Sequence, residues 1–191
     1  MDVSILDRLA IYRNLVTLGD GTRVLLRLLD RGDQDRLQAM FDVVGDDDLQ
    51  FMRDNVRDSL VTQRWVDGLD YGQVVPLVAV VNDEIVGDAT LHLGKGPQRH
   101  TAEVRIFLSK PYRQRGLGVM MLTALIDIAK KLNLHLLTAE VIADRTPVIR
   151  AFRGLGFQLQ TTLPDYFLMP DGETLDVALL ILPLVRTVTS V

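Results

Sequence analysis

The sequence predicts an α+β fold in which a mixed, mostly antiparallel sheet of about six to seven strands carries helices on both faces. Two patterns predict it: short apolar runs bounded by turn residues, and intervening stretches whose apolar residues recur at helical spacing. The chain has 191 residues, 48% of them hydrophobic, which is enough to bury one substantial core. No internal repeat or low-complexity linker interrupts it, so we expect a single globular domain.

The N-terminal stretch is expected to form an amphipathic helix over residues 4–18. Apolar side chains recur there at helical spacing from Ile5 to Val16, and the glycine-rich turn at Gly19-Asp20-Gly21 follows. Such a helix favours a dedicated partner or a homodimer surface. The predicted organisation has three parts: an N-terminal helical extension (1–21), a single domain (22–186) and a C-terminal tail (187–191).

Strands and helices alternate through the rest of the chain. The turn at Asn82-Asp83-Glu84 joins two apolar runs into a β-hairpin, and Pro147 suits the first turn of a later helix. Strands are predicted over residues 22–29, 74–81, 85–93, 102–108, 134–142, 157–162 and 175–182. Helices are predicted over residues 33–44, 46–52, 61–69 and 119–132, and from residue 146 to Gly154 or Gly156.

Composition narrows the function classes. Residues 1–100 hold 11 basic and 17 acidic side chains and the rest hold 10 and 8, so no dense basic stripe favours nucleic acid. No apolar run approaches the ~20 residues that cross a bilayer, and no export segment leads the chain, so we expect a cytoplasmic protein without a membrane partner. The chain has no Cys, and its three His lack metal-ligand spacing, so no metal is expected.

The most informative stretch is Arg113-Gln114-Arg115-Gly116-Leu117-Gly118, which stands between a predicted strand and a long apolar helix. A glycine-bearing turn lets successive backbone N–H groups converge on an anion, and the positive end of the helix dipole adds to the attraction. No acidic residue lies between Glu103 and Asp127, so a polyphosphate is expected to meet little repulsion.

Two other phosphate sites fit this turn poorly. An ATP P-loop needs a Gly-Lys-Ser/Thr sequence, which does not follow here. A dinucleotide fold needs a parallel strand–helix–strand series with an acidic residue at the ribose-binding distance, and the predicted elements do not provide it. A coenzyme with a diphosphate, such as an acyl-coenzyme A, remains.

The same stretch resembles the Q/R-x-x-G-x-G/A signature of the GNAT superfamily of acyl-CoA-dependent N-acetyltransferases. The resemblance extends in order along about residues 22–184. It includes the strand from Glu103 to Ser109, the run Ala151-Phe152-Arg153-Gly154-Leu155-Gly156-Phe157, similar to the family's "YEKLGF" segment, and the closing strand after Asp171-Gly172. The six-residue signature is moderately specific, and the ordered set is considerably more so.

The resemblance implies acetyl-CoA as the co-substrate. In such enzymes the backbone amides of the turn hold the diphosphate, and the end of the preceding strand pairs with the pantetheine as a peptide-like edge. The N–H of Leu108 is then expected to polarise the thioester carbonyl as part of an oxyanion hole. The cofactor-binding residues implied here are Ile106, Phe107, Leu108, Arg113, Gln114, Arg115, Gly116, Leu117, Gly118, Val119 and Phe152.

Acetyl transfer to an amine requires that the ammonium lose a proton before it attacks the thioester. Similar enzymes use a glutamate at the position of Glu103, and Glu140 at the end of the next strand is the reserve candidate. We expect direct attack in a ternary complex, without an acyl-enzyme. A small amine or amino acid and a protein lysine both remain open as the acceptor.

The chain departs from the family pattern at the leaving group. The tyrosine that often protonates the CoA thiolate falls at Phe152, which has no proton to give. Tyr112 and Tyr166 are the alternative donors, or the thiol leaves as the anion, since a thiol is acidic enough. A non-catalytic acyl-CoA-binding sensor or structural module is therefore an alternative function, and a general phosphate- or nucleotide-binding domain is a second one.

Overall fold

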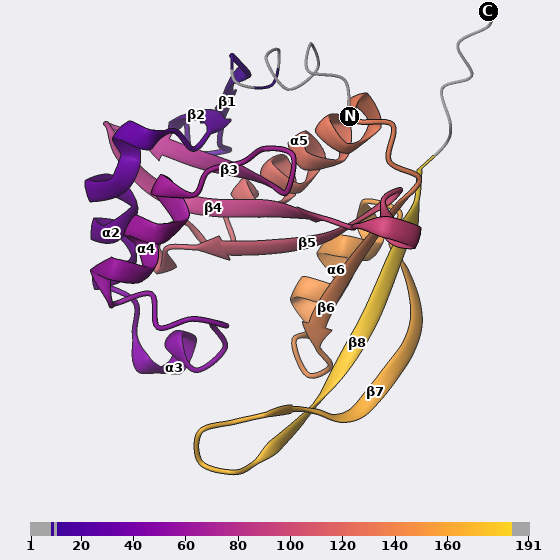
Figure 1. Cartoon of the computed structure of the whole chain (residues 1–191). Coiled ribbons are helices and arrows are strands. Elements are labelled where there is room, and N and C mark those ends of the chain that lie inside the picture. Colours follow the sequence, from indigo (N-terminus) through magenta and orange to yellow (C-terminus); the bar gives the residue numbers. More distant parts are fainter. Residues whose placement is uncertain (1–8, 10, 185–191) are drawn as a thin grey trace, which may run out of the picture.

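The computed structural model describes residue 9 and residues 11–184. Eight strands form one sheet in the order β1-β2-β3-β4-β5-β6-β8-β7 (Figure 1). The strands are β1 (Arg13–Thr17), β2 (Arg23–Leu28), β3 (Val74–Val81), β4 (Glu84–Leu93), β5 (Thr101–Leu108), β6 (Leu136–Ile142), β7 (Gln158–Leu168) and β8 (Thr174–Pro183). The helices are α2 (Gln34–Asp42), α3 (Asp46–Leu49), α4 (Ser59–Asp67), α5 (Leu117–Lys131) and α6 (Thr146–Gly154).

Helices cover both faces of the sheet, as the sequence predicts. Alternate residues of β3 enter two separate cores: Leu77 packs in the cluster that contains α5, and Val78 packs in the cluster that contains α2 and α4. Leu125 of α5 and Phe41 of α2 are among the fully buried side chains. Among the described residues, no helix is long and apolar enough to cross a membrane.

The predicted hairpin between β3 and β4 is confirmed. Asn82 and Asp83 connect the two strands, with φ angles of 48° and 68°. Two consecutive left-handed residues make the turn that matches the right-handed twist of paired strands, and Asn and Asp tolerate this conformation better than most side chains.

The sheet opens between β5 and β6, which are its one parallel pair among the described strands. Pairing there covers three positions and ends at Glu103 opposite Thr138. β5 then continues to Leu108 and β6 to Ile142, and Figure 1 shows the two strands diverging. Past this point β5 and β6 therefore make no backbone hydrogen bonds to each other. On its other side, β5 still pairs with β4 as far as Leu108.

The N-terminal helix expected over residues 4–18 is wrong for its second half. Residues 13–17 form β1, which pairs antiparallel with β2 at five positions. Pairing with β2 satisfies the backbone groups on one side of this segment, and that tertiary contact overrides its helical spacing. Residues 1–8 and 10, and the tail from residue 185, lie outside the described residues. With β1 the sheet has eight strands, one more than the upper expectation.

β7 is longer than its predicted range of 157–162. It continues through Pro164 to Leu168, and its register with β8 shifts between Leu163 and Phe167. The predicted end at Thr162 lies just before Pro164, which cannot donate to a sheet ladder. β7 is one of the two edge strands of the sheet, where a proline and an irregular register are tolerated.

Candidate active site

The turn before α5 has the backbone of an anion cradle. Gln114 and Gly116 both have left-handed φ angles, 57° and 85°. Gly116 is the N-cap of α5 and no side chain caps this helix, while the first helical hydrogen bond runs from the Met120 N–H to the Gly116 carbonyl at 3.2 Å. The backbone N–H groups of Leu117, Gly118 and Val119 precede that bond and have no partner one turn back in the helix. The turn therefore fits a diphosphate.

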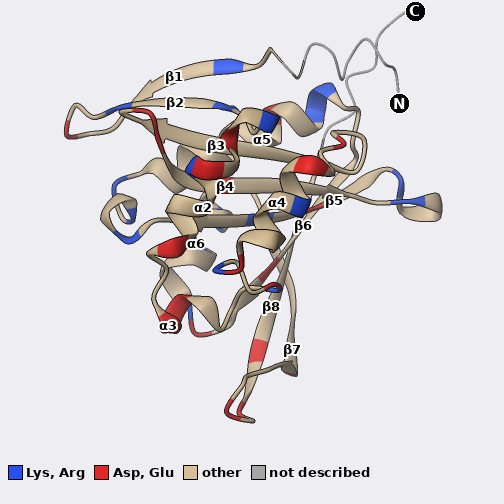
Figure 2. Cartoon of the chain, turned by 60° about the vertical axis from the view of Figure 1, so that its left-hand side comes forward, with Lys and Arg blue, Asp and Glu red and all other residues tan. Residues whose placement is uncertain are grey.

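Three carboxylates lie beside the cations of this turn, which the sequence does not suggest. Nζ of Lys110 lies 2.9 Å from Oδ2 of Asp47, and Nη2 of Arg113 lies 2.7 Å from Oδ2 of Asp48. Arg115 pairs with Asp20 and donates to the hydroxyl of Thr22 at 2.8 Å. The expectation that a polyphosphate meets little repulsion here is therefore wrong. Acidic residues far away in the sequence, on α3 and in the β1–β2 turn, lie close to this turn in the folded chain (Figure 2).

The open edge of β5 presents backbone groups toward β6. Ser109 donates its N–H to the carbonyl of Val86 in β4 at 3.0 Å. The carbonyl of His100, by contrast, accepts the N–H of His135, the residue before β6, at 2.8 Å. Because successive residues of a strand direct their backbone groups to opposite neighbours, those of Ile106 and Leu108 face the opening. This geometry fits the predicted pairing with an extended, amide-bearing ligand.

The side chains at the end of β5 pack on both faces of the sheet. Ile106 and Leu108 pack against the core that contains α5, and Phe107 packs against the opposite core. The Phe107 ring lies 5.7 Å from the ring of Phe41. The strand end is thus fixed from both sides while its backbone edge stays open.

The two predicted bases share one cluster on the face of the sheet that carries α2 and α4. Nη2 of Arg53 lies 2.7 Å from Oε1 of Glu103 and 3.3 Å from Oε2 of Glu140. Arg105 binds Glu103 through Nε at 2.9 Å and through Nη2 at 2.8 Å. The hydroxyl of Tyr166 donates to Oε1 of Glu140 at 3.3 Å. The structure therefore brings together all three residues predicted for catalysis and adds two arginines.

The pairing sets the ionisation of Glu103. Burial alone would raise its pKa, but the hydrogen bonds and charge of Arg105, together with the charges of Arg53 and His92, lower the pKa below its usual value. Glu103 is therefore a carboxylate with reduced basicity in the free protein. Glu140 accepts two longer hydrogen bonds, one from Arg53 and one from Tyr166.

Two more titratable side chains share this face through the β4–β5 register. His92 lies opposite Glu103, and Asp88 lies opposite Phe107. Burial, with the charge of Arg105, lowers the pKa of His92 to about 4, and its Nε2 lies 3.0 Å from the hydroxyl of Thr90. Burial raises the pKa of Asp88 to about 7. Near neutral pH His92 is thus largely uncharged and Asp88 is about half protonated, in contrast to Glu103.

The candidate proton donors differ in access. Phe152, where similar enzymes have a tyrosine, is 2% exposed and packs edge-to-face on Phe157 with the ring centroids 5.0 Å apart. The ring of Tyr112 lies under the guanidinium of Arg115, 5.1 Å from its carbon. Tyr166 is 50% exposed and contacts Glu140, so its hydroxyl belongs to the carboxylate cluster.

Arg53 and Asp48 are the functional candidates that sequence reasoning missed. Arg53 follows α3 in a segment without secondary structure of its own, and 50 residues separate it from Glu103. The acidic run that contains Asp48 is typical of a solvated helix N-terminus. No motif marks either residue, because each meets its partner only when the fold brings residues that are distant in the sequence together.

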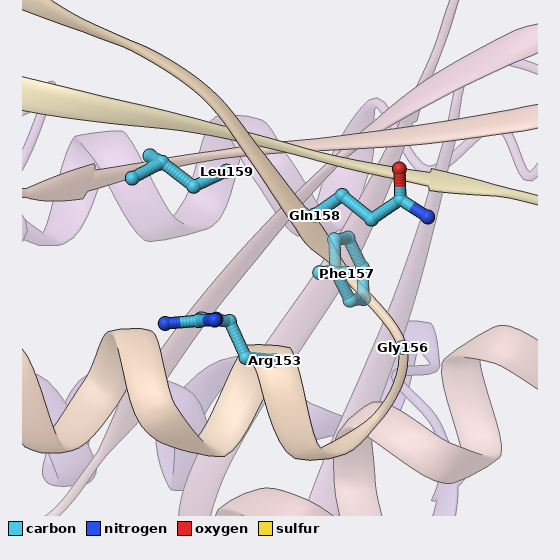
Figure 3. A pocket seen from close by; sticks show the side chains of 5 residues that line it. All are labelled: Arg153, Gly156, Phe157, Gln158 and Leu159. Atoms are coloured by element: carbon cyan, nitrogen blue, oxygen red, sulfur yellow. The ribbon is translucent and has the colours of Figure 1, made fainter.

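The chain also has a hollow away from this cluster. It measures about 460 Å³ and lies between the end of α6 and the start of β7, where Arg153, Gly156, Phe157, Gln158 and Leu159 line it (Figure 3). None of the predicted site residues lines it. Within the described residues, no group of three or more His, Cys, Asp or Glu side chains is arranged to hold a metal ion.

A model of the Acetyltransferase (GNAT) family matches residues 37–157, more than half of the chain. The chain belongs to this family. The match includes α2 from Leu37 onward, the carboxylates Glu103 and Glu140, the turn before α5, and α6. The chain is thus an acetyl-CoA-dependent N-acetyltransferase, and the GNAT fold expected from the sequence is confirmed.

Two similar proteins are named for amino-acid substrates. The chain is 26% identical over 115 residues to the L-amino acid N-acetyltransferase AaaT of Escherichia coli, a match that spans 59% of this chain and 70% of that protein. It is 33% identical over 67 residues to an L-methionine sulfoximine/L-methionine sulfone acetyltransferase of Pseudomonas aeruginosa. That second match spans only 35% of this chain and 39% of the relative.

Solved structures share the fold at lower identity. The acetyltransferase yncA of Salmonella typhimurium with acetyl-CoA superposes with a TM-score of 0.73 at 20% identity, over 87% of this chain and 96% of that one. The ribosomal L7/L12 acetyltransferase RimL in complex with CoA gives a TM-score of 0.76 at 15% identity, over 90% and 98% of the two chains.

Proposed function

We propose that this GNAT enzyme transfers the acetyl group of acetyl-CoA to the primary amine of a small zwitterionic acceptor, an α-amino acid or a close analogue. The observation that carries the proposal is the position of Arg53 between Glu103 and Glu140. One cation in contact with two carboxylates marks the place where an ammonium group is favoured. Arg105, which binds Glu103, offers a partner for a carboxylate of the acceptor.

The two carboxylates have different proposed roles. Glu103 keeps its charge because Arg105 binds it in two-point fashion, which suits an anchor for an ammonium group. Glu140 is held by two 3.3 Å contacts, so its lone pairs are more available to accept a proton. We assign the general base to Glu140, and Tyr166 orients it.

The reaction balances as direct transfer in a ternary complex. Glu140 takes one proton from the ammonium, the freed nitrogen forms a bond to the acetyl carbon, and the carbon–sulfur bond breaks with its electron pair on sulfur. The nitrogen then gives up its second proton to water, which leaves the neutral amide. The N–H of Leu108 faces the opening and is the proposed donor to the thioester oxygen. Because Phe152 carries no hydroxyl and is buried, coenzyme A is proposed to leave as the thiolate.

The proposed cofactor site uses the backbone from Gln114 to Val119 for the diphosphate and the β5 edge for the pantetheine. The left-handed angles of Gln114 and Gly116 support it, because they turn successive N–H groups toward one side. Arg113 and Arg115 are already paired with carboxylates, so we assign their side chains a weaker part in holding phosphate than the sequence suggests.

An amine panel tests this function. Purified protein with acetyl-CoA is given L-amino acids, their carboxamides, simple alkylamines and lysine-bearing peptides, and the release of free thiol is followed. We expect transfer to at least one amino acid and at least tenfold lower kcat/KM for its carboxamide, which lacks the carboxylate. Preference for peptides would favour a protein acceptor, and binding of acetyl-CoA without thiol release would favour the sensor.

A further inference from the structure

Arg113 makes four contacts at the end of β5. Its Nε donates to the carbonyl of Leu108 at 2.8 Å, and its two Nη atoms donate to the two oxygens of Asp48 at 3.1 and 2.7 Å. The guanidinium carbon also lies 5.5 Å from the centroid of the Phe107 ring. A planar guanidinium that fills these positions at once is fixed in orientation.

The bonded pair is shielded from solvent compared with its neighbours. The side chains of Arg113 and Asp48 are 33% and 15% exposed. The adjacent pair of Lys110 and Asp47 joins the same two segments but is much more exposed on both sides. Because exposed ion pairs contribute little, the Asp48 pair is the one that restrains the relative position of α3 and the strand end.

Both ends of this connection lead to the proposed site. On one side, the Leu108 carbonyl lies on the open edge of β5, on the residue whose N–H is the proposed donor to the thioester. On the other side, Asp48 belongs to α3, and the segment that follows carries Arg53 to Glu103 and Glu140. The ring of Phe51 in that segment lies 5.3 Å from the guanidinium carbon of Arg145.

We propose that Asp48 is a positioning residue that acts through Arg113 to hold the acceptor-binding segment and the thioester-binding strand end in register. The inference rests on the proposed acceptor site, but the structural link itself does not depend on the acceptor's identity. Replacing the Asp48 carboxylate by a carboxamide removes the charge and one of the two oxygens that Arg113 binds, which frees the guanidinium to turn away from Leu108. The donor at Leu108 and the cation at Arg53 then move independently, although the phosphate turn keeps its backbone.

Four variants test the proposal, with Asp47→Asn as the matched control, because Asp47 stands beside Asp48 in α3 and also pairs with a cation of the turn. Asp48→Asn is expected to lower kcat/KM for the acceptor at least tenfold, through both a higher KM and a lower kcat. The Kd for acetyl-CoA is expected to change less than threefold. Arg113→Lys is expected to behave alike, because lysine keeps the charge but cannot bond Asp48 and Leu108 together. Asp47→Asn is expected to stay within twofold of the wild type, and Asp48→Glu to recover part of the loss.

Hydrogen exchange of the unliganded proteins provides a readout that needs no acceptor. Asp48→Asn is expected to speed exchange both in the peptide covering residues 46–57 and in the peptide covering residues 103–113, and Asp47→Asn in neither. If the wild type acetylates no amine, the proposed function fails while this measurement still decides the link. Faster exchange in residues 46–57 alone, equal kinetics of the two asparagine variants, or wild-type kinetics of Arg113→Lys would each overturn the proposal.

Discussion

Nη2 of Arg53 lies 2.7 Å from Oε1 of Glu103, and the same nitrogen also contacts Glu140. A guanidinium in this place compensates two carboxylates that would otherwise repel each other across the sheet. An ammonium group that enters the site can take over that compensation and leave Arg53 free to bind the carboxylate of the same acceptor together with Arg105. The residue is therefore expected to govern recognition of the acceptor more than binding of the coenzyme.

Arg53→Gln is expected to raise the KM for an amino-acid acceptor at least tenfold and to change the acetyl-CoA Kd less than twofold. The reason is the loss of a cation that contacts both Glu103, the proposed anchor of the ammonium group, and Glu140, the proposed base. Initial rates at varied acceptor and calorimetry with acetyl-CoA measure the two constants. Arg57→Gln is the control, since Arg57 lies in the same segment but pairs with Asp46. A matching KM change in both variants would contradict a specific role.

Glu140→Gln and Glu103→Gln are expected to differ in kind. Without the proposed base, Glu140→Gln loses about 10²-fold or more in kcat and regains activity as pH rises and free amine becomes abundant. Glu103→Gln mainly raises the acceptor KM, because a carboxylate whose pKa is lowered by Arg105 despite its burial is a poor proton acceptor. Profiles of kcat and kcat/KM against pH separate the two. The reverse pattern would move the base to Glu103.

Gly116→Asp is expected to abolish acetyl-CoA binding, because it places a side chain and a like charge in the cradle where φ is 85°. Gly172→Asp is the matched control: its φ is 89°, and a Cβ there also meets open space, but it lies in the turn between β7 and β8. Both variants should lose a similar ~1–2 kcal/mol of stability from left-handed strain. Calorimetry that finds acetyl-CoA affinity unchanged in Gly116→Asp would remove the site assignment.

Asp33→Asn is expected to lower the free energy of unfolding by about 3–5 kcal/mol, because it leaves the buried guanidinium of Arg27 without its buried carboxylate partner. The two Arg27–Asp33 hydrogen bonds measure 2.5 and 2.6 Å, and Asp33 is fully buried. Asp83→Asn is the control, since Asp83 is 80% exposed and its loss should cost less than about 1 kcal/mol. Urea denaturation of both variants decides, and equal losses would contradict the prediction.

The same pair predicts a loss of stability in acid. Burial would raise the pKa of Asp33, but the hydrogen bonds from Arg27 and from the Asp30 backbone lower it overall. A lowered folded-state pKa means that the stabilisation is present above the unfolded value of 3.8 and is lost as pH falls below it. Asp33→Asn should therefore show a weaker acid transition than the wild type.

Asp88 and His92 are expected to oppose each other between pH 4 and 6.5. The pKa of Asp88 rises from 3.8 to about 7, so its stabilisation is present at low pH and is lost as pH rises toward 7. The pKa of His92 falls from 6.5 to about 4, so its stabilisation is present above 6.5 and is lost as pH falls toward 4. Each contributes a slope of up to about 1.4 kcal/mol per pH unit, with opposite signs.

Removing one of the two groups should expose the slope of the other. Asp88→Asn is expected to make the free energy of unfolding rise with pH over this interval, and His92→Gln to make it fall. Urea denaturation at pH 4.5, 5.5 and 6.5 measures the slopes. If both variants keep the nearly flat profile of the wild type, these two groups do not titrate as their burial implies.

The sequence determined the features that depend on neighbouring residues. The spacing of the apolar residues determined where the strands form, and Asn82-Asp83 determined the position of the hairpin turn. Gly116 before an apolar helix set the backbone of the turn that we propose for phosphate, and this backbone geometry needs no distant partner. Local spacing and turn chemistry suffice for such features because their geometry is decided within a few residues of the chain.

Only the tertiary structure decided which charges meet. Arg53 and Glu103 are 50 residues apart, and Arg113 and Asp48 are 65 apart, so no local pattern connects them. The tertiary structure also decided that residues 13–17 pair with β2 as a strand, although their spacing favours a helix. It likewise decided the burial that raises the pKa of Asp88. Pairing, burial and charge compensation depend on the positions of the elements in space, and many sequences with these local signals would assemble a different set of partners.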